Sequence, residues 1–267
     1  MRIVLWVGNE SNQKALANKI GNDSEIVGIV TESRKGKRKI TFAKLFEKGI
    51  EILMLSNISR SWLSMKSFYE NKFPIWPDVP IIDTENINSE NIYEFTKALN
   101  PDLIVVSGTS MIRKRLLSIN PSIGIINLHT GLSPYIKGGP NCTNWCISTD
   151  QFEFIGNTVM WIDSGIDTGK IIATELTSFT GHESLTEVHI KVMEHAHELY
   201  VRTINKLSTT NLSGVKQDSI VNGKTYYSKQ WGLKEKINLI INFRKFKKTI
   251  SSDSYKEKQA SINLVHL

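Results

Sequence analysis

The 267-residue sequence is poor in cysteine, and this scarcity excludes two classes of small, cross-linked fold. Its two cysteines, Cys142 and Cys146, are four positions apart, and the chain has no third cysteine to complete a zinc knuckle. Two thiols are also too few for the disulfide framework of a small secreted domain. We therefore expect both to be reduced side chains that pack in the interior.

Long hydrophobic runs are also missing. No eighteen consecutive residues are apolar, so the sequence predicts no membrane span. The apolar run at residues 2–8 is short and lacks a small-residue cleavage site, which favours a first strand over a signal peptide. Only Gly8-Asn9-Glu10 follows it, so the glycine-rich fingerprint of dinucleotide-binding folds is absent. These absences together predict a cytoplasmic protein.

Acidic residues are scarce near the C-terminus only. Residues 206–267 carry 12 Lys and Arg against 4 Asp and Glu, whereas residues 1–205 carry 21 against 22. Such a tail can attract phosphates, acidic lipids or nucleic acid, or it can be a solvated surface. A second basic run at 34–39 is open to the same two interpretations, a phosphate-binding loop or a surface loop.

Short apolar runs alternate with helical patterns over the first half of the chain. This alternation is typical of an α/β fold with a Rossmann-like, mostly parallel sheet and helices on both faces. The predicted strands are residues 2–8, 25–30, 50–55, 102–107 and 123–128, and the predicted helices between them include 11–20 and 91–99.

Residues 184–205 predict one long helix. Ser184 and Glu187 form a capping-box pattern at its start. A helical repeat of apolar residues marks its buried face: Val188, Val192, Ala196 and Leu199. Three histidines also lie on it: His189, His195 and His197. Because residues two apart diverge on a helix, His195 and His197 cannot chelate one metal ion together, and we interpret all three as helix-surface histidines.

The composition changes after Leu207. Residues 208–214 are rich in Ser, Thr, Asn and Gly, as in a linker. Asn222-Gly223 before Thr225, Tyr226 and Tyr227 is a hairpin signal, and residues 233–249 predict a basic helix. We therefore predict a main domain at 1–207 and a small hairpin-and-helix appendage at 208–267.

Residues 124–172 hold the side chains most suited to chemistry. Asn127 and His129 lie two apart at a predicted strand end, so they share one face. Ligands of open α/β sheets bind at such strand ends. A later loop carries Asp163 and Asp167. An amide, an imidazole and a carboxylate could together polarise a carbonyl, hold an oxyanion and move a proton. Residue types alone favour a buried structural histidine and two surface aspartates, because such residues are common.

The pattern formed by these residues is more specific. Asn127-x-His129 is followed by Ser133-Pro-Tyr-x-x-Gly138, and then by Asp163-x-Gly-x-Asp167-x-Gly-x-Ile-Ile172. In this order and spacing the motifs resemble those of the folate-dependent formyltransferases. That family includes glycinamide ribonucleotide transformylase, methionyl-tRNA formyltransferase and the nucleotide-sugar N-formyltransferases. The resemblance covers about residues 1–205 and is strongest over 102–172.

The resemblance implies roles for individual residues. Asn127, His129 and Asp167 match the catalytic trio of the family, whose co-substrate is 10-formyltetrahydrofolate and which needs no metal. Two loops are expected to bind that co-substrate through these residues: Gly108, Ser110, Met111, Ile112, Asp163, Gly165 and Ile166. The segment after His129 is expected to contact the acceptor through these residues: Tyr135, Lys137 and Gly138.

The sequence also departs from the commoner family pattern. Where many members have Ser two positions after the histidine and Leu-Pro further on, this chain has Gly131 and Ser133-Pro134. This form most resembles the nucleotide-sugar branch. The expected function is therefore transfer of a formyl group to the primary amine of a nucleotide-linked amino sugar, a surface-polysaccharide precursor.

Three other functions remain open. A methionyl-tRNA acceptor would call for a larger C-terminal nucleic-acid domain than the roughly sixty residues after Leu207. Glycinamide ribonucleotide is the second alternative. The third is a non-catalytic module that binds folate or a sugar nucleotide. Because an isolated hairpin needs its aromatic face covered, we expect a homodimer built on residues 221–227, with packing on the same subunit as the alternative. Nucleic acid is not an expected partner.

Overall fold

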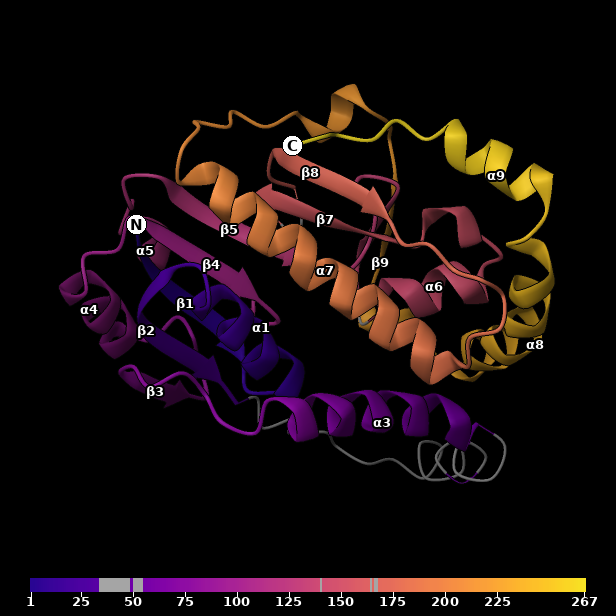
Figure 1. The fold of residues 1–267 in the computed structure, drawn as a ribbon, viewed down its shortest axis with the longest axis horizontal. Helices are drawn as coiled ribbons and strands as arrows, with labels where there is room; N and C mark the ends of the chain where they lie inside the picture. The colour runs from indigo at the N-terminus through magenta and orange to yellow at the C-terminus, as the bar shows by residue number, and fades with distance from the viewer. Residues whose placement is uncertain (34–48, 50–54, 140, 164, 166–167) are drawn as a thin grey trace.

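A computed structural model describes residues 1–33, 49, 55–139, 141–163, 165 and 168–267 (Figure 1). Its centre is a seven-stranded sheet in the order β3-β2-β1-β4-β5-β7-β8. The first five strands of that order pair in parallel, whereas β7 and β8 join antiparallel at one edge. The strands are β1 (Arg2–Gly8), β2 (Glu25–Glu32), β3 (Ile81–Thr84), β4 (Leu103–Ser107), β5 (Gly124–His129), β7 (Gly156–Trp161) and β8 (Ile171–Leu176).

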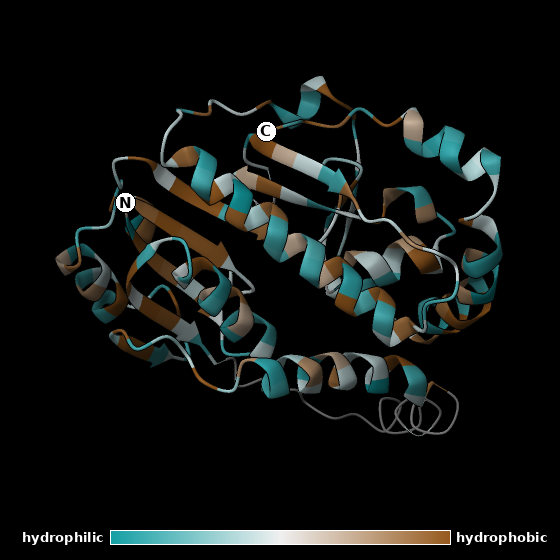
Figure 2. Cartoon of the chain, viewed as in Figure 1, coloured by the Kyte–Doolittle hydropathy of each residue, from teal (hydrophilic) through white to brown (hydrophobic). Residues whose placement is uncertain are grey.

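Helices cover both faces of this sheet, as the sequence predicts for a Rossmann-like fold. On one face, α1 (Ser11–Gly21) and the long α7 (Leu185–Leu207) pack on the inward residues of β1, β4 and β5. On the other, α4 (Glu90–Ala98) and α5 (Lys114–Leu117) cover the alternate residues of the same strands. Because both faces are covered, β4 is buried at every position, and the central strands are mostly hydrophobic in Figure 2.

Most predicted elements of the first 207 residues are confirmed. The strands at 2–8, 25–30, 102–107 and 123–128 and the helices at 11–20, 91–99 and 184–205 all form, with small shifts at their ends. The capping box of Ser184 and Glu187 is present at the start of α7. The predicted strand at 50–55 and the basic run at 34–39 lie outside the described residues, apart from Leu55. Helix α3 (Ser56–Lys72), which the sequence analysis did not include, packs beside α1 and α7.

The structure corrects the prediction that the histidines of α7 lie on the helix surface. His189 is 3% exposed and His197 is fully buried, because both side chains lie between α7 and α3. There His189 contacts the ring of Trp62 edge-on, with ring centroids 5.7 Å apart, and His197 lies 5.7 Å from the ring of Tyr69. His195 is instead held between Thr177 and Glu175 of the β8 edge.

A second core lies beyond the edge of the sheet. It is built around α6 (Cys142–Ser148), the short η1 (Phe152–Phe154), α8 (Leu233–Thr249) and α9 (Asp253–Ala260). The helix predicted at 233–249 is confirmed as α8, and Phe246 from it is fully buried against Phe152 and Phe179. The C-terminal segment therefore completes a core that the first 207 residues begin.

The predicted hairpin at residues 221–227 is wrong. Strand β9 (Lys224–Tyr226) instead pairs in parallel with β6 (Ile136–Gly138), far earlier in the chain. Gly138 has a φ of +85°, and a Cβ there would lie 2.1 Å from the carbonyl oxygen of Tyr226, so glycine permits this pairing. The ring of Tyr226 stacks on Trp145, with centroids 4.4 Å apart, and is thus covered by its own subunit. The connections η2 (Gln217–Ser219) and η3 (Ser228–Gln230) flank this strand.

Candidate active site

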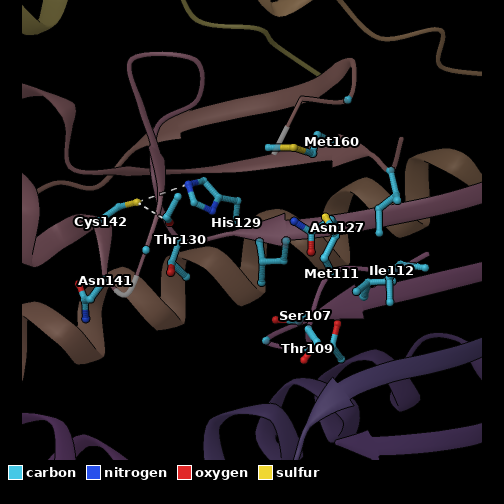
Figure 3. A pocket seen from close by; sticks show the side chains of 18 of the residues that line it. Ser107, Thr109, Met111, Ile112, Asn127, His129, Thr130, Asn141, Cys142 and Met160 are labelled. Atoms are coloured by element: carbon cyan, nitrogen blue, oxygen red, sulfur yellow. Dashed lines mark hydrogen bonds between the residues drawn. The ribbon is translucent and has the colours of Figure 1, made fainter. Parts of the chain in front are cut away.

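A cavity of about 620 Å³ opens at the carboxyl ends of β4 and β5 (Figure 3). This is where ligands bind in open α/β sheets. One wall comes from the loop after β4, another from the segments around β7, and a third from the start of α6 together with the residues around β9. Its volume is in the usual range for a small-molecule site.

Asn127 and His129 both line this cavity, as the two-residue spacing predicts. They lie on β5, where Asn127 is opposite Met160 and His129 is opposite Thr158 of β7. His129 is 9% exposed, so its imidazole is largely removed from solvent. Both side chains can donate hydrogen bonds.

The turn after His129 is fixed by a buried hydroxyl. Thr158 donates to the carbonyl oxygen of Gly131 at 2.7 Å and accepts from the backbone N–H of Ser133 at 2.9 Å. The chain is therefore turned sharply away from the sheet directly after the histidine. This leaves the end of β5 open to the cavity.

Cys142 contacts the histidine ring. Its Sγ lies 3.5 Å from Nε2 of His129 and 3.4 Å from the carbonyl oxygen of Gly138. Cys142 begins α6, whose cap is the Asn141 side chain accepting from the N–H of Asn144. Both cysteines are free and buried, as predicted. Their sequence spacing gave no sign that one of them touches His129.

The loop after β4 forms the first wall of the cavity. Gly108, Ser110, Met111 and Ile112, the expected co-substrate residues of this loop, all line it. The buried carboxylate of Glu32 holds the loop in place, because it accepts the backbone N–H of Ser110 and that of Ile87. The sequence analysis did not include Glu32.

The segment after β7 forms the second wall. Asp163 and Gly165 line the cavity. The Asp163 carboxylate accepts from the N–H of Gly165 at 2.9 Å and from the hydroxyl of Thr168 at 2.6 Å, so it shapes its own loop. Asp167 and Ile166, the other predicted residues of this loop, lie outside the described residues.

The three residues expected to contact the acceptor lie in different places. Gly138 lines the cavity. Lys137 is on β6 opposite Thr225. Tyr135 stacks on Phe154, with centroids 4.9 Å apart, and its hydroxyl accepts the N–H of Asn263 at 3.0 Å. The tyrosine therefore packs against the second core and the C-terminal segment.

The cavity also has lining residues that the sequence analysis did not select. They include Asn12 and Gln13 of α1, Trp62 of α3, Met193 of α7, and Thr225, Tyr226, Tyr227 and Ser228. The last four come from beyond residue 207, so the cavity is not contained in the predicted main domain. The order of short motifs could not reveal them, because each contributes by tertiary packing alone.

Two further properties of the described residues bear on the chemistry. No group of three His, Cys, Asp or Glu side chains among them is arranged to hold a metal ion. Every helix in the described ranges is too short or too polar to cross a lipid bilayer. The arrangement offers hydrogen-bond donors on one strand end, facing a cavity of small-molecule size. Such donors can stabilise negative charge on a carbonyl oxygen.

Comparison with known proteins places this chain in a family. Residues 1–204 match the family described as Formyl transferase. Curated relatives include the methionyl-tRNA formyltransferase of Clostridium tetani (strain Massachusetts / E88), 38% identical over 125 residues that cover 46% of this chain and 39% of that protein. The enzyme of the same name from Clostridium beijerinckii is 30% identical over 208 residues, 76% of this chain and 58% of that protein. The chain thus spans only about half the length of the curated relatives it matches.

Solved structures share the fold. A sugar N-formyltransferase from Shewanella sp FDAARGOS_354 aligns with a TM-score of 0.55 at 15% identity, covering 91% of this chain and 88% of that one. Phosphoribosylglycinamide formyltransferase from Bacillus halodurans aligns with a TM-score of 0.52 at 21% identity, covering 79% and 96%. At these identities the likeness shows the fold alone. The family match, which extends over well more than half of the sequence, shows that the chain belongs to the formyl transferase family.

Proposed function

We propose that the protein transfers a formyl group from 10-formyltetrahydrofolate to the primary amine of a nucleotide-linked amino sugar. The observation that carries this proposal is the position of Asn127 and His129 on one strand end, between the loop of Gly108–Ile112 and the loop of Asp163. Family membership supports formyl transfer as the reaction.

In the proposed reaction the neutral acceptor amine attacks the formyl carbon. Negative charge develops on the formyl oxygen, to which the amide of Asn127 and the imidazole of His129 donate hydrogen bonds. Loss of one such donor typically costs about 2.7–4 kcal/mol of activation free energy. Asp167, whose role rests on the motif alone, would orient His129 and take the proton of the amine. The bond between the formyl carbon and N10 of the carrier then breaks, N10 takes up a proton in place of the one that the amine lost, and tetrahydrofolate leaves as the second product.

A small acceptor is favoured by the cavity itself. Residues from both the first 207 positions and the segment around β9 enclose it, and its 620 Å³ is a small-molecule volume. A second candidate acceptor is methionyl-tRNA, because the curated relatives at 38% and 30% identity carry that activity in their names. The basic residues after position 206 would then serve the tRNA backbone.

One experiment separates these acceptors. The protein is incubated with 10-formyltetrahydrofolate and, separately, a panel of amino-sugar nucleotides, methionyl-tRNA and glycinamide ribonucleotide. Mass spectrometry then detects gain of CO, and absorbance follows release of tetrahydrofolate. We expect formylation of an amino-sugar nucleotide. Formylation of methionyl-tRNA alone would replace the proposed acceptor. Binding of 10-formyltetrahydrofolate, with no release of tetrahydrofolate in the presence of any of the acceptors, would indicate a binding module.

A further inference from the structure

The thiol of Cys142 is fixed on two sides at the edge of the cavity. It donates to the carbonyl oxygen of Gly138 at 3.4 Å, and its sulfur lies 3.5 Å from Nε2 of His129 (Figure 3). The side chain is 2% exposed. Since β6 holds Gly138 and the first turn of α6 holds Cys142, the thiol joins two separate backbone segments to the histidine ring.

The direction of these hydrogen bonds determines which part of the Cys142 thiol faces the imidazole ring of His129. A thiol has one hydrogen to donate and a weakly accepting sulfur. Because the hydrogen goes to Gly138, the sulfur presents a lone pair to Nε2 of His129. This arrangement favours the forms of the imidazole in which Nε2 carries hydrogen. Because sulfur is a weak acceptor, the formyl oxygen can take over this hydrogen in the proposed reaction, and the thiol orients the donor without competing strongly for it.

Gly131 supplies the space for this contact. A Cβ at position 131 would lie 2.5 Å from Nε2 of His129 and 2.8 Å from Sγ of Cys142, too close for either atom to stay in place. Thr158 holds the Gly131 carbonyl, so the backbone has little freedom to retreat. Glycine at this position is thus the steric counterpart of the cysteine.

We propose that Cys142 is a positioning residue for His129, holding the ring and its Nε2 hydrogen in the orientation used for formyl transfer, in a contact that glycine at position 131 makes room for. The proposal rests on the proposed function, because ring orientation affects turnover only if His129 acts on the formyl group. The contact itself is independent of that function.

Cys146 provides a matched control within the same helix. It lies one turn further along α6, is equally buried, and its thiol donates to the carbonyl oxygen of Phe154 at 3.6 Å. A substitution of Cys146 removes the same thiol group from the second core as the matching substitution of Cys142 does. A difference between the two positions therefore reports the contact with His129 and not the general loss of a buried thiol.

The experiment compares Cys142→Ala and Cys142→Ser with Cys146→Ala and Cys146→Ser in the full chain. We expect Cys142→Ala to lower kcat about tenfold, the effect of one ordinary hydrogen bond, with KM for either substrate changed by less than about twofold. Cys142→Ser should recover part of the loss, since a hydroxyl can also donate and accept. Both Cys146 variants should keep the kcat of the unaltered protein.

Nitrogen-15 NMR of the imidazole gives a readout that needs no turnover. The His129 signals are assigned by their loss in His129→Asn. Cys142→Ala should shift the Nε2 signal, and Cys146→Ala should leave it in place. If the shift occurs in a protein that transfers no formyl group, the proposed function fails and the contact stands. Equal kcat and equal Nε2 signals in Cys142→Ala and Cys146→Ala would overturn the proposal.

Discussion

The hydroxyl of Tyr200 lies 2.9 Å from the carbonyl oxygen of Ile126. The same hydroxyl accepts the N–H of Val106 at 3.1 Å, so a side chain of α7 enters the backbone ladder between β4 and β5. This point is directly before Asn127. Burial raises the pKa of Tyr200, which keeps the phenol neutral and able to donate. The long helix thus fixes the strand end on which the candidate site is built.

Tyr200→Phe tests this support. We expect the free energy of unfolding to fall by about 1–3 kcal/mol, because the change leaves buried backbone groups of β4 and β5 without their partner. Urea denaturation measures the effect. Tyr93→Phe, which removes a hydroxyl on the opposite face of the sheet, is the control. A loss in Tyr200→Phe no larger than in the control would show that the hydroxyl does not hold the strands.

His129→Asn and Asn127→Ala test the proposed oxyanion donors. Each variant is expected to fold and to lower turnover at least about 100-fold, because each removes a donor to the formyl oxygen. Thermal melting checks the fold, and tetrahydrofolate release measures turnover. Near-normal turnover in both variants would refute the assignment of these residues.

The two acids of the second loop are expected to differ. Asp163 holds Gly165 and Thr168, so Asp163→Asn should mainly raise the KM for 10-formyltetrahydrofolate by loosening the loop. Asp167→Asn should mainly lower kcat, because the motif assigns this residue to proton transfer. Steady-state kinetics separate the two effects. The reverse pattern would mean that the motif is aligned one acid out of register.

Truncation after Leu207 is expected to prevent folding. It would remove Phe246 and Leu239, both fully buried in the second core, and expose the apolar face of α6. Phe246→Ala in the full chain should lower the free energy of unfolding by about 3–5 kcal/mol, and Phe243→Ala, at a half-buried neighbour, by clearly less. A cooperative melting transition in a 1–207 fragment would contradict this. The homodimer stays a prediction, which sedimentation velocity on the full chain checks.

Stability should decrease as the pH falls below about 6.5. Burial lowers the pKa of His189 to about 4 and that of His197 well below its ordinary value. Between the unfolded value of about 6.5 and these lowered values, the unfolded chain binds more protons, so acid favours unfolding by up to about 1.4 kcal/mol per pH unit for each histidine. Urea midpoints at pH 7 and pH 5 measure the slope. His197→Leu should flatten it, and an unchanged slope would exclude this histidine as a cause.

The sequence predicted the strand ends of the site well. Apolar runs buried on both faces leave a strong signal, and the two-residue spacing of Asn127 and His129 places both on one cavity wall. The burial of His189 and His197 could not be predicted in the same way. A neutral imidazole can pack in a core as an aromatic ring does, and these two rings contact Trp62 and Tyr69. Residue type alone does not separate that role from a surface one.

The pairing of β6 with β9 was beyond sequence reasoning for another reason. Each strand has three residues, too few to show an alternating pattern, and Asn222-Gly223 is a local signal for a hairpin. The competing partner was distant in sequence. The contact of Cys142 with His129 could not be predicted from the sequence either, because it depends on where α6 begins relative to the end of β5.

The parallel pairing of β6 with β9 also determines when the walls of the cavity can be completed during synthesis. During synthesis, Asn127 and His129 leave the ribosome long before Thr225 and Tyr226, which line the same cavity. All strands of the parallel part of the sheet have been made by the end of β5. The cavity nevertheless lacks a wall until β9 arrives and the distant strands join, a slow step for contacts of such separation. Binding at this cavity therefore requires that the chain be made at least as far as β9.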